Sequence, residues 1–477
     1  MQHYIVAWTL ASLSGLVVGS LVKPASNTGF LSHQKLDCAR TAACSLQHTH
    51  RIFAMRRLLF SLLNVSLIAS SSSGRCASNR LNQSHRNGIA CIDSMETHVF
   101  RESIPQLSSR CDLEKKDRLT NDHIHEVVIA IKPKNMEELT RILHDVSDPV
   151  SENYGRHLTR NEVRDLTSNP GANLAVTSYL GDIGASIVSE SLDGEYITAT
   201  APIHIWEEMF HAEFHTFGQT HQDGIRSDTI RAEEYWIPSE LHEHIEYVMN
   251  VVDVPCISQK GPTRDVNSKT SRKLFDKVKF GRITPLKLRE AYNMSNSHGS
   301  ILSTQAVYTT GRNYFGVDDL AWFQANMSGQ SLQPAISINN HDTTDCIKND
   351  CAEGNLDIQY LMAMSPVSPT YHWHSRYGIY TWLRLMAQTP TIPLVLSVSY
   401  GAYEKTTSIG EKDGFTTMAK RFGAMGRTIL VACGDTGAAD KLGGVYPTCQ
   451  YTPDFPGSSP YVVSVGSTMV RYCRSQK

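Results

Sequence analysis

The chain has little net charge, and this shortage excludes some classes of protein. Its 477 residues carry a formal charge of −2, and only 19% of them are charged. A nucleic-acid-binding protein needs an excess of positive charge that attracts phosphates, and no such excess is present, so we expect no nucleic-acid partner. Hydrophobic residues make up 41% of the sequence, as in ordinary globular proteins, which argues against disorder. The length allows two or three domains, and no internal repeat is visible.

Long hydrophobic runs are also scarce, and the two that exist lie near the start. Tyr4–Val22 is apolar but is interrupted by Thr and Ser residues and has a nearly uncharged flank. Met55–Ala69 has a basic start, a short apolar core and small residues after it, which is typical of a secretory signal. We therefore predict that residues 1–54 are upstream sequence and that residues 55–76 are a signal peptide, with no stable membrane span. In the alternative, Tyr4–Val22 is the signal or a membrane anchor.

Cysteine usage agrees with export. Of eleven cysteines, eight follow residue 76, and an even number after a signal peptide predicts disulfides. Cys346 and Cys351 flank one loop and are candidates to staple it, although the sequence alone leaves the pairing open. The tripeptides that begin at Asn82, Asn293 and Asn326 match the N-glycosylation signal.

Residues 99–255 show strand and helix patterns in alternation. His125–Lys132 predicts a strand, and Asn135–Asp145 predicts a helix with its apolar residues on one side. This rhythm is typical of a small α/β domain with an antiparallel sheet. Residues 256–282 follow with eight Lys or Arg residues against two Asp residues, which predicts an exposed linker that is cut by proteases, or simply a solvated basic linker.

From Ile283 to Lys477 the pattern changes to short apolar strands separated by helices. Strands buried on both faces read as apolar runs, so this alternation predicts a parallel sheet with flanking helices. The predicted strands are Leu394–Val398, Thr428–Ala432 and Val462–Val465, and the predicted helices are Leu356–Met364, Thr381–Ala387 and Gly414–Phe422.

The run Glu353-Gly-Asn-Leu-Asp357 places two carboxyl groups four residues apart at the front of a predicted helix. Residues i and i+4 stack on one helix face, so the two acids face each other. Mutual repulsion separates the pKa values of such a pair, which lets one group act as acid and the other as base. The alternative is a solvated acidic helix start, where carboxylates favour the positive end of the helix dipole.

Three later segments and one earlier segment complete a pattern. Ser397-Val-Ser-Tyr-Gly401, Thr428–Gly437 with its Gly-Asp435-Thr-Gly ending, and Pro453–Gly466 follow the carboxyl pair, and Asp148–Thr159 precedes it. In this order the segments resemble the sedolisin (serine-carboxyl peptidase) family, in its tripeptidyl-peptidase I-like branch. The resemblance implies a subtilisin-like parallel sheet preceded by an α/β activation prodomain.

The resemblance also implies roles for individual residues. Glu353 would be the general base, Asp357 would support it through a shared proton, and a protonated Asp435 would stabilise the oxyanion. Ser399 and Gly401 would lie along the substrate cleft and contribute main-chain contacts. Without the resemblance, Asp435 is typical of a turn between glycines.

For the whole protein, the resemblance implies an acid peptidase of the lysosome, vacuole or extracellular space. Its substrates would be peptides or proteins, from which it would release N-terminal tripeptides or which it would cut internally. Its own prodomain would be its inhibitor.

The family's Ser-Gly-Thr-Ser nucleophile motif does not occur in the 477 residues. The calcium site expected for the complete family domain would follow that motif. We therefore predict a truncated catalytic domain without turnover, and alternatively a non-catalytic inhibitor or peptide-binding protein. Cys433 next to His372 or His374 is a poor substitute nucleophile, because buried structural cysteines and packed histidines are more usual.

Overall fold

The structure is a computed structural model, and the residues that it describes all lie in one compact unit of the chain. The predicted upstream segment, the signal peptide and Asn82 lie outside the described residues. The described ranges are 97–104, 112–220, 226–253, 258–259, 283–294, 297–311, 313–338, 351–375, 378–434 and 453–466.

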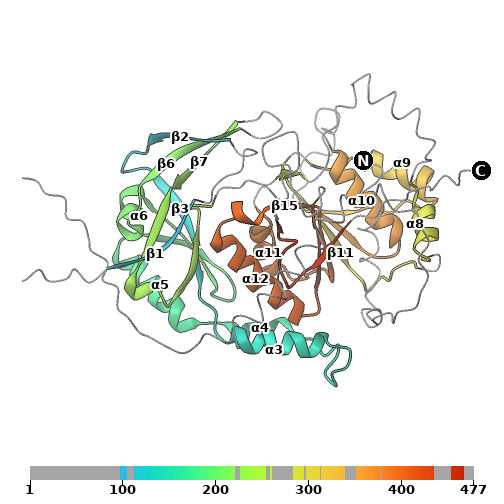
Figure 1. Ribbon diagram of the computed structural model, residues 1–477, viewed down its shortest axis with the longest axis horizontal. Helices are drawn as coiled ribbons and strands as arrows, with labels where there is room; N and C mark the ends of the chain where they lie inside the picture. Colours follow the sequence, from blue (N-terminus) through green and yellow to red (C-terminus); the bar gives the residue numbers. More distant parts are fainter. Residues whose placement is uncertain are drawn as a thin grey trace, which may run out of the picture. The chain divides into compact units, whose positions relative to one another are not determined.

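The amino-terminal part (residues 97–253) contains the antiparallel sheet that the sequence predicts. Residues Val127–Ile131 of its strand β3 (Ile124–Ile131; Figure 1) are all buried, because alternate side chains enter two different hydrophobic clusters, and the strand pairs with a neighbour on each side. The predicted strand at His125–Lys132 is confirmed. In the order β4-β5-β3-β9, the strands are Ser186–Glu190, Tyr196–Pro202, Ile124–Ile131 and Ile245–Met249.

Two smaller antiparallel sheets and several helices complete this part. The predicted helix near residue 140 is confirmed, and two helices that were not predicted follow it. Their starts are capped, since Thr159 and Asn169 accept hydrogen bonds from the first turns. The elements are β1 (His98–Ser103) with β8 (Glu234–Pro238); β2 (Asp112–Arg118), β6 (Phe214–Thr220) and β7 (Arg226–Ala232); α3 (Met136–Ser147), α4 (Arg160–Thr167), α5 (Pro170–Asp182), α6 (Ile203–Phe210) and the turn η1 (Ser239–Leu241).

The carboxy-terminal part (residues 283–466) is built on a six-stranded sheet in which every pair of neighbours is parallel. The expected fold class, a parallel sheet with flanking helices after an antiparallel-sheet part, is confirmed. In the order β12-β13-β11-β14-β16-β18, the strands are Ile336–Ile338, Thr370–His374, Gln305–Thr309, Val395–Val398, Thr428–Ala432 and Val463–Val465.

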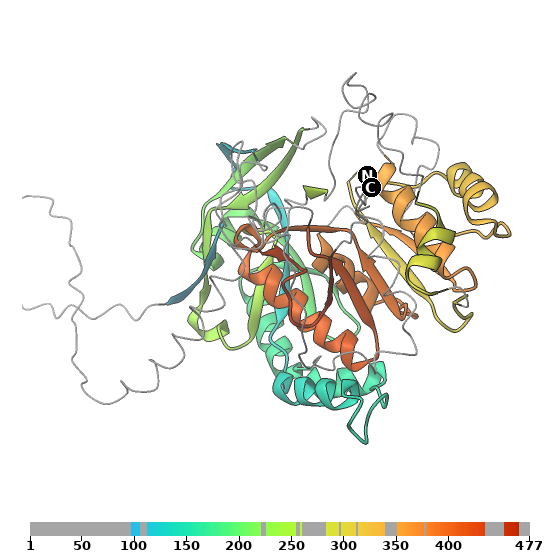
Figure 2. The ribbon, with the colours of Figure 1, turned by 45° about the vertical axis from the view of Figure 1, so that its right-hand side comes forward.

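Helices cover both faces of this sheet (Figures 1 and 2). Successive residues of β11 show the division: Val307 packs against α10, whereas Ala306 and Tyr308 pack in the cluster that contains α11 and α12. The remaining elements are α8 (Pro285–Ala291), α9 (Val317–Phe323), η2 (Gln324–Ser328), α10 (Ala352–Met364), α11 (Ile379–Ala387), η4 (Glu404–Thr406), α12 (Ile409–Ala424), and β10 (Ser258–Gln259), β15 (Tyr400–Tyr403) and β17 (Asp454–Phe455), which form a small antiparallel sheet.

The largest hydrophobic core joins the two parts. Leu143 and Tyr247 of the amino-terminal part pack in one cluster with Trp382, Phe415 and Phe422 of the carboxy-terminal part. Gly414 and Gly423 allow this approach, because an added Cβ would lie 2.4 Å from the Tyr247 hydroxyl and 2.7 Å from a Leu143 methyl carbon. The amino-terminal part therefore docks mainly through α11 and α12.

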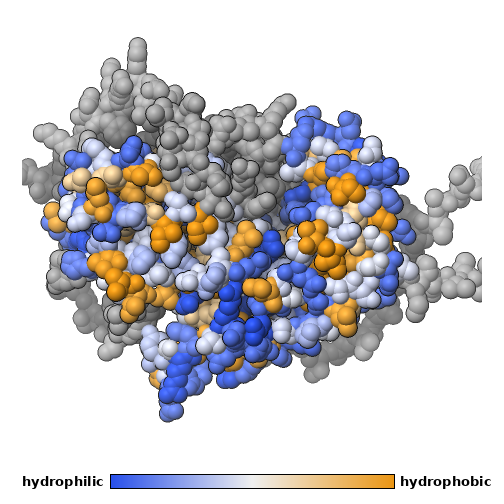
Figure 3. All heavy atoms as spheres, turned by 180° about the vertical axis from the view of Figure 1, so that it is seen from behind, coloured by the Kyte–Doolittle hydropathy of each residue, from blue (hydrophilic) through white to orange (hydrophobic). Residues whose placement is uncertain are grey.

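Apolar side chains on the rear surface form separate patches among polar ones rather than a continuous belt (Figure 3). Among the described residues, no helix combines the length and the apolar character needed to cross a membrane.

Candidate active site

Helix α10 carries both predicted catalytic carboxyl groups. Glu353 lies in its first turn and Asp357 one turn later, so the predicted placement on one helix is confirmed. Gly354 sits between them and packs against the backbone, where an added Cβ would lie 2.2 Å from the carbonyl oxygen of Tyr314. A glycine is therefore required for the helix to begin this close to the neighbouring loop.

Asp357 is held by a serine from the sheet. The Ser399 hydroxyl lies 2.7 Å from each carboxylate oxygen of Asp357 and is the donor, since a carboxylate only accepts. Ser399 directly follows β14 and is buried. The acid therefore lies at the carboxyl end of a central parallel strand, the edge at which ligands of open α/β sheets usually bind.

Burial controls the electrostatics of this group. Removal from water raises the pKa of Asp357 to about 7, and the hydrogen bond from Ser399 acts in the opposite direction. At acidic pH Asp357 is therefore protonated.

Tyr400 lies beside both acids and was not predicted as a site residue. Burial raises the pKa of Tyr400, and the charges of Asp357 and then Glu353 raise it further. Its ring meets that of Tyr308 edge-on at 5.5 Å. The structure thus places Glu353 and Asp357 close to Tyr400, whose ring contacts Tyr308. The sequence signal for Tyr400 is its position in the segment Ser399-Tyr-Gly401.

The main chain of β15, which contains Tyr400 and Gly401, is already paired with the short strand β10. β10, in the predicted basic linker, runs antiparallel to β15, with Ser258 opposite Gly401 and Gln259 opposite Tyr400. Gly401 also lines a cavity of about 290 Å³ between the two parts. Gly401 thus lies in an extended strand, and its contact with substrate stays a prediction, while the Ser399 side chain donates to Asp357.

The remaining predicted site residues are placed in part. Asp435 lies outside the described residues, and β16 ends three residues before it. The side chains of Asn293 and Asn326 are exposed, as glycosylation requires. Cys351 is disulfide-bonded, while Cys346 lies outside the described residues, so their pairing stays a prediction.

The positions of Cys433 and His372 do not support a cysteine nucleophile activated by this histidine. Cys433 is a free, exposed thiol, whereas His372 is fully buried. The His372 ring packs on Phe315 at 4.7 Å, and its Nε2 lies 3.1 Å from the Thr309 hydroxyl. Burial lowers the pKa of His372 to about 3, which fits a packed neutral imidazole.

A second group of buried carboxyl groups lies where the amino-terminal part contacts α12. Glu102 of β1 accepts hydrogen bonds from the amides of Ile409 (2.9 Å) and Gly410 (3.2 Å) and so caps the start of this helix. Glu102 and Glu411 both line the 290 Å³ cavity. Burial raises the pKa of Glu411 to about 7, and the charges of Asp253 and Glu102 add to the effect.

Further along α12, the amino-terminal part contacts this helix through a side-chain hydrogen bond and an ion pair. The Thr417 hydroxyl donates to Glu246 at 2.8 Å, and Arg421 forms an ion pair with Glu195 in which both side chains are almost fully buried. Burial raises the pKa of Glu195, and the guanidinium of Arg421 works against this rise. The amino-terminal part therefore holds α12 at its start, middle and end.

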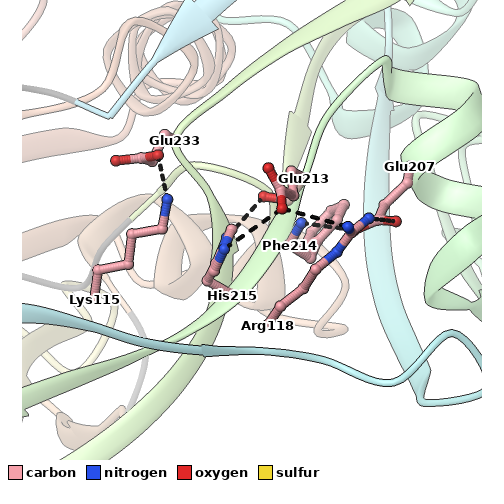
Figure 4. Close-up of polar contacts among 7 residues, drawn as sticks. All are labelled: Lys115, Arg118, Glu207, Glu213, Phe214, His215 and Glu233. Atoms are coloured by element: carbon pink, nitrogen blue, oxygen red, sulfur yellow. Dashed lines mark hydrogen bonds and ion pairs between the residues drawn. The ribbon is translucent and has the colours of Figure 1, made fainter.

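A wider cavity of about 560 Å³ in the amino-terminal part is lined by several glutamates, three of which form ion pairs. Lys115 contacts Glu233 at 2.5 Å, and Arg118 contacts Glu207 at 2.9 Å and Glu213 at 3.5 Å (Figure 4). These ion pairs are mostly exposed and contribute little energy. This cavity is not the candidate active site.

No group of three or more metal-binding side chains occurs among the described residues, and the calcium site stays a prediction.

The sequence of this chain is similar to those of several known proteins. A family profile described as "Pro-kumamolisin, activation domain" matches residues 112–254. Tripeptidyl-peptidase 1 of Homo sapiens is 28% identical over 356 residues, which cover 72% of this chain and 61% of that protein. The Dictyostelium discoideum tripeptidyl-peptidase 1 is 27% identical over 384 residues, with coverages of 72% and 62%.

A third relative, physarolisin of Physarum polycephalum, is 27% identical over 385 residues, which cover 76% of this chain and 62% of that protein. The chain thus spans about three fifths of the length of these relatives. The resemblance to the sedolisin family is confirmed.

Proposed function

We propose that this relative of the sedolisins acts in acid peptide hydrolysis, with Glu353 as general base and Asp357 as its proton-sharing partner. The observation that carries the proposal is the position of the two acids on one face of α10, beside the buried Tyr400. An ionised Glu353 next to a protonated Asp357 removes a proton from a hydroxyl nucleophile most effectively below neutral pH. At higher pH, Asp357 loses the shared proton and the arrangement fails.

The nucleophile would be a serine hydroxyl activated by Glu353. Because the 477 residues contain no Ser-Gly-Thr-Ser sequence, we expect them to show no turnover by themselves. Attack on the peptide carbonyl would form an acyl-enzyme, with a protonated Asp435 as the donor to the oxyanion. Calcium would be the metal that stabilises a domain of this kind.

The amino-terminal part would be the inhibitor of the same site. Pairing of β10 with Tyr400–Gly401 occupies the main-chain groups that a substrate strand would use. The contacts along α12 hold this part in place. Cleavage in the basic stretch between residues 260 and 282 would release it and free the strand edge.

Substrate class and location follow from the relatives. The name tripeptidyl-peptidase favours release of tripeptides from N-termini, and internal cutting is the other form of the same chemistry. A route through the secretory pathway to a lysosome, vacuole or the cell exterior fits the predicted signal peptide and the exposed Asn293 and Asn326.

A second candidate function is non-catalytic peptide binding or inhibition. The β10–β15 pairing favours it, because it shows that the edge of β15 accepts an extended strand. In that case the carboxyl pair would serve only the fold.

Hydrolysis of a tripeptide-amide separates the two candidates. We expect a chain that carries both the carboxyl pair and a serine nucleophile to cleave it near pH 4 and not near pH 8, with Glu353→Gln lowering kcat by about 10²- to 10⁴-fold. Glu290→Gln, on the exposed side of α8, is the matched control and should keep full activity. Full activity of Glu353→Gln would contradict the proposed base, and hydrolysis by the 477 residues would contradict the proposed origin of the nucleophile.

A further inference from the structure

The side chain of Ser399 contacts one of the two acids of α10. Its side chain is buried, and its hydroxyl lies 2.7 Å from both oxygens of Asp357. A hydroxyl has one proton to donate, so the two contacts are one hydrogen bond shared between two acceptors. This geometry is satisfied only when the carboxyl group of Asp357 points at Ser399.

The surroundings of Asp357 make this donor important. Tyr400 on β15 lies close enough to feel the charges of both Asp357 and Glu353, and its ring contacts that of Tyr308 on β11. Glu353 is acidic and both tyrosines are neutral at pH 5 to 8, so none of these groups supplies positive charge. Burial opposes ionisation of Asp357, and the Ser399 hydroxyl is the group shown to favour it.

We propose that Ser399 is a positioning residue that fixes the orientation of Asp357 and stabilises its ionised form, and so sets how the carboxyl pair shares its proton. The catalytic consequence rests on the proposed function, but the contact itself does not. Hydrogen bonds to ionised groups are roughly twice as strong as neutral ones, so the contribution of Ser399 depends on the charge of Asp357. A serine that only fills space would contribute equally at every pH.

Thermal unfolding of the 477-residue chain at pH 5 and pH 8 tests this dependence without requiring turnover. At pH 5 the buried Asp357 is protonated, and at pH 8 it is ionised and needs its donor. We expect Ser399→Ala to lower Tm by about 5 °C more at pH 8 than at pH 5. In an Asp357→Asn background this extra loss should disappear, and Ser399→Thr, which keeps the hydroxyl, should restore the wild-type pH dependence.

Ser397→Ala is the matched control, because Ser397 is also buried and lies two positions earlier on β14. Its effect on Tm should be the same at both pH values. If Ser399→Ala does not fold, Ser399→Cys replaces it, since a thiol is a weak donor of similar shape and should give a smaller loss of the same pH dependence. An equal loss at both pH values, or an extra loss that survives in Asp357→Asn, would overturn the proposal. Because no catalysis is measured, this result is independent of the outcome of the peptidase assay.

Discussion

Helices α10 and α12 each carry buried ionisable groups, but the two sets have different partners. Asp357 on α10 is held by the neutral hydroxyl of Ser399, whereas Arg421 on α12 is held by the charged Glu195. Burial raises the pKa of both acids, and a neutral partner leaves that of Asp357 near 7. A buried acid with a neutral donor can therefore gain or lose its proton near neutral pH. A buried acid paired with a cation instead holds two parts of the chain together.

Removal of the charged partner should have the largest effect. Arg421→Met would leave Glu195 buried without its cation and should lower the free energy of unfolding at pH 7 by about 3–5 kcal/mol. The loss should be smaller in acid, because burial raises the pKa of Glu195 and so favours its neutral form as the pH falls. Urea denaturation at neutral and acidic pH measures it.

The matched control is Arg141→Met on α3, which removes an exposed ion pair with Glu138. This control should leave the urea midpoint unchanged. Equal and small effects of both substitutions would show that the α12 ion pair does not hold the two parts together.

The second largest effect on stability should come from Glu411, which lies near the acidic groups of Asp253 and Glu102. Glu411 has its pKa raised from 4.5 to about 7, mainly by burial. A raised folded-state pKa stabilises the fold fully below about pH 4.5, and this contribution is lost as the pH rises through 7. Glu411→Gln should therefore raise the free energy of unfolding at pH 8 by up to about 3 kcal/mol and leave it unchanged at pH 4.

Denaturant midpoints at pH 4 and pH 8 give this comparison. Glu137→Gln on the exposed face of α3 should change neither value. A lower midpoint for Glu411→Gln at pH 8 would mean that the ionised group has a stabilising partner and is not a cost to the fold.

The smallest effect concerns the cap of α12. Glu102→Ala removes the acceptor for the amides of Ile409 and Gly410 and should cost about 1–2 kcal/mol. Hydrogen exchange of these two amides should become faster, while amides in α10 should keep their rates. Glu114→Ala on β2, which is exposed, serves as the control. Unchanged exchange at Ile409 and Gly410 would contradict the capping role.

Local patterns predicted the elements whose own residues determine them. The strand Thr428–Ala432 has the predicted bounds, and α10 begins four residues before its predicted start at Leu356 and ends where predicted. Strand β13 was missed, because Thr370–His374 contains two histidines that look polar in sequence. They are buried because neighbouring strands and loops cover them, which is a tertiary effect.

The candidate site shows the same limit. Glu353 and Asp357 were found because they lie one helical turn apart, a spacing visible in the sequence. The contact between Asp357 and Ser399 joins residues 42 positions apart, and no periodicity reports it. The contact forms because the fold brings the residue that follows β14 to α10.

Direct titration of Asp357 tests the central claim, that this carboxyl group holds a proton for Glu353 in acid and releases it near neutrality. Carbon-13 NMR of the aspartate-labelled chain, compared with Asp357→Asn, isolates the resonance of this group. The account predicts one carboxyl resonance that titrates near pH 7 and is absent from Asp357→Asn. A resonance of Asp357 that titrates near pH 4, as for a solvated aspartate, would contradict it.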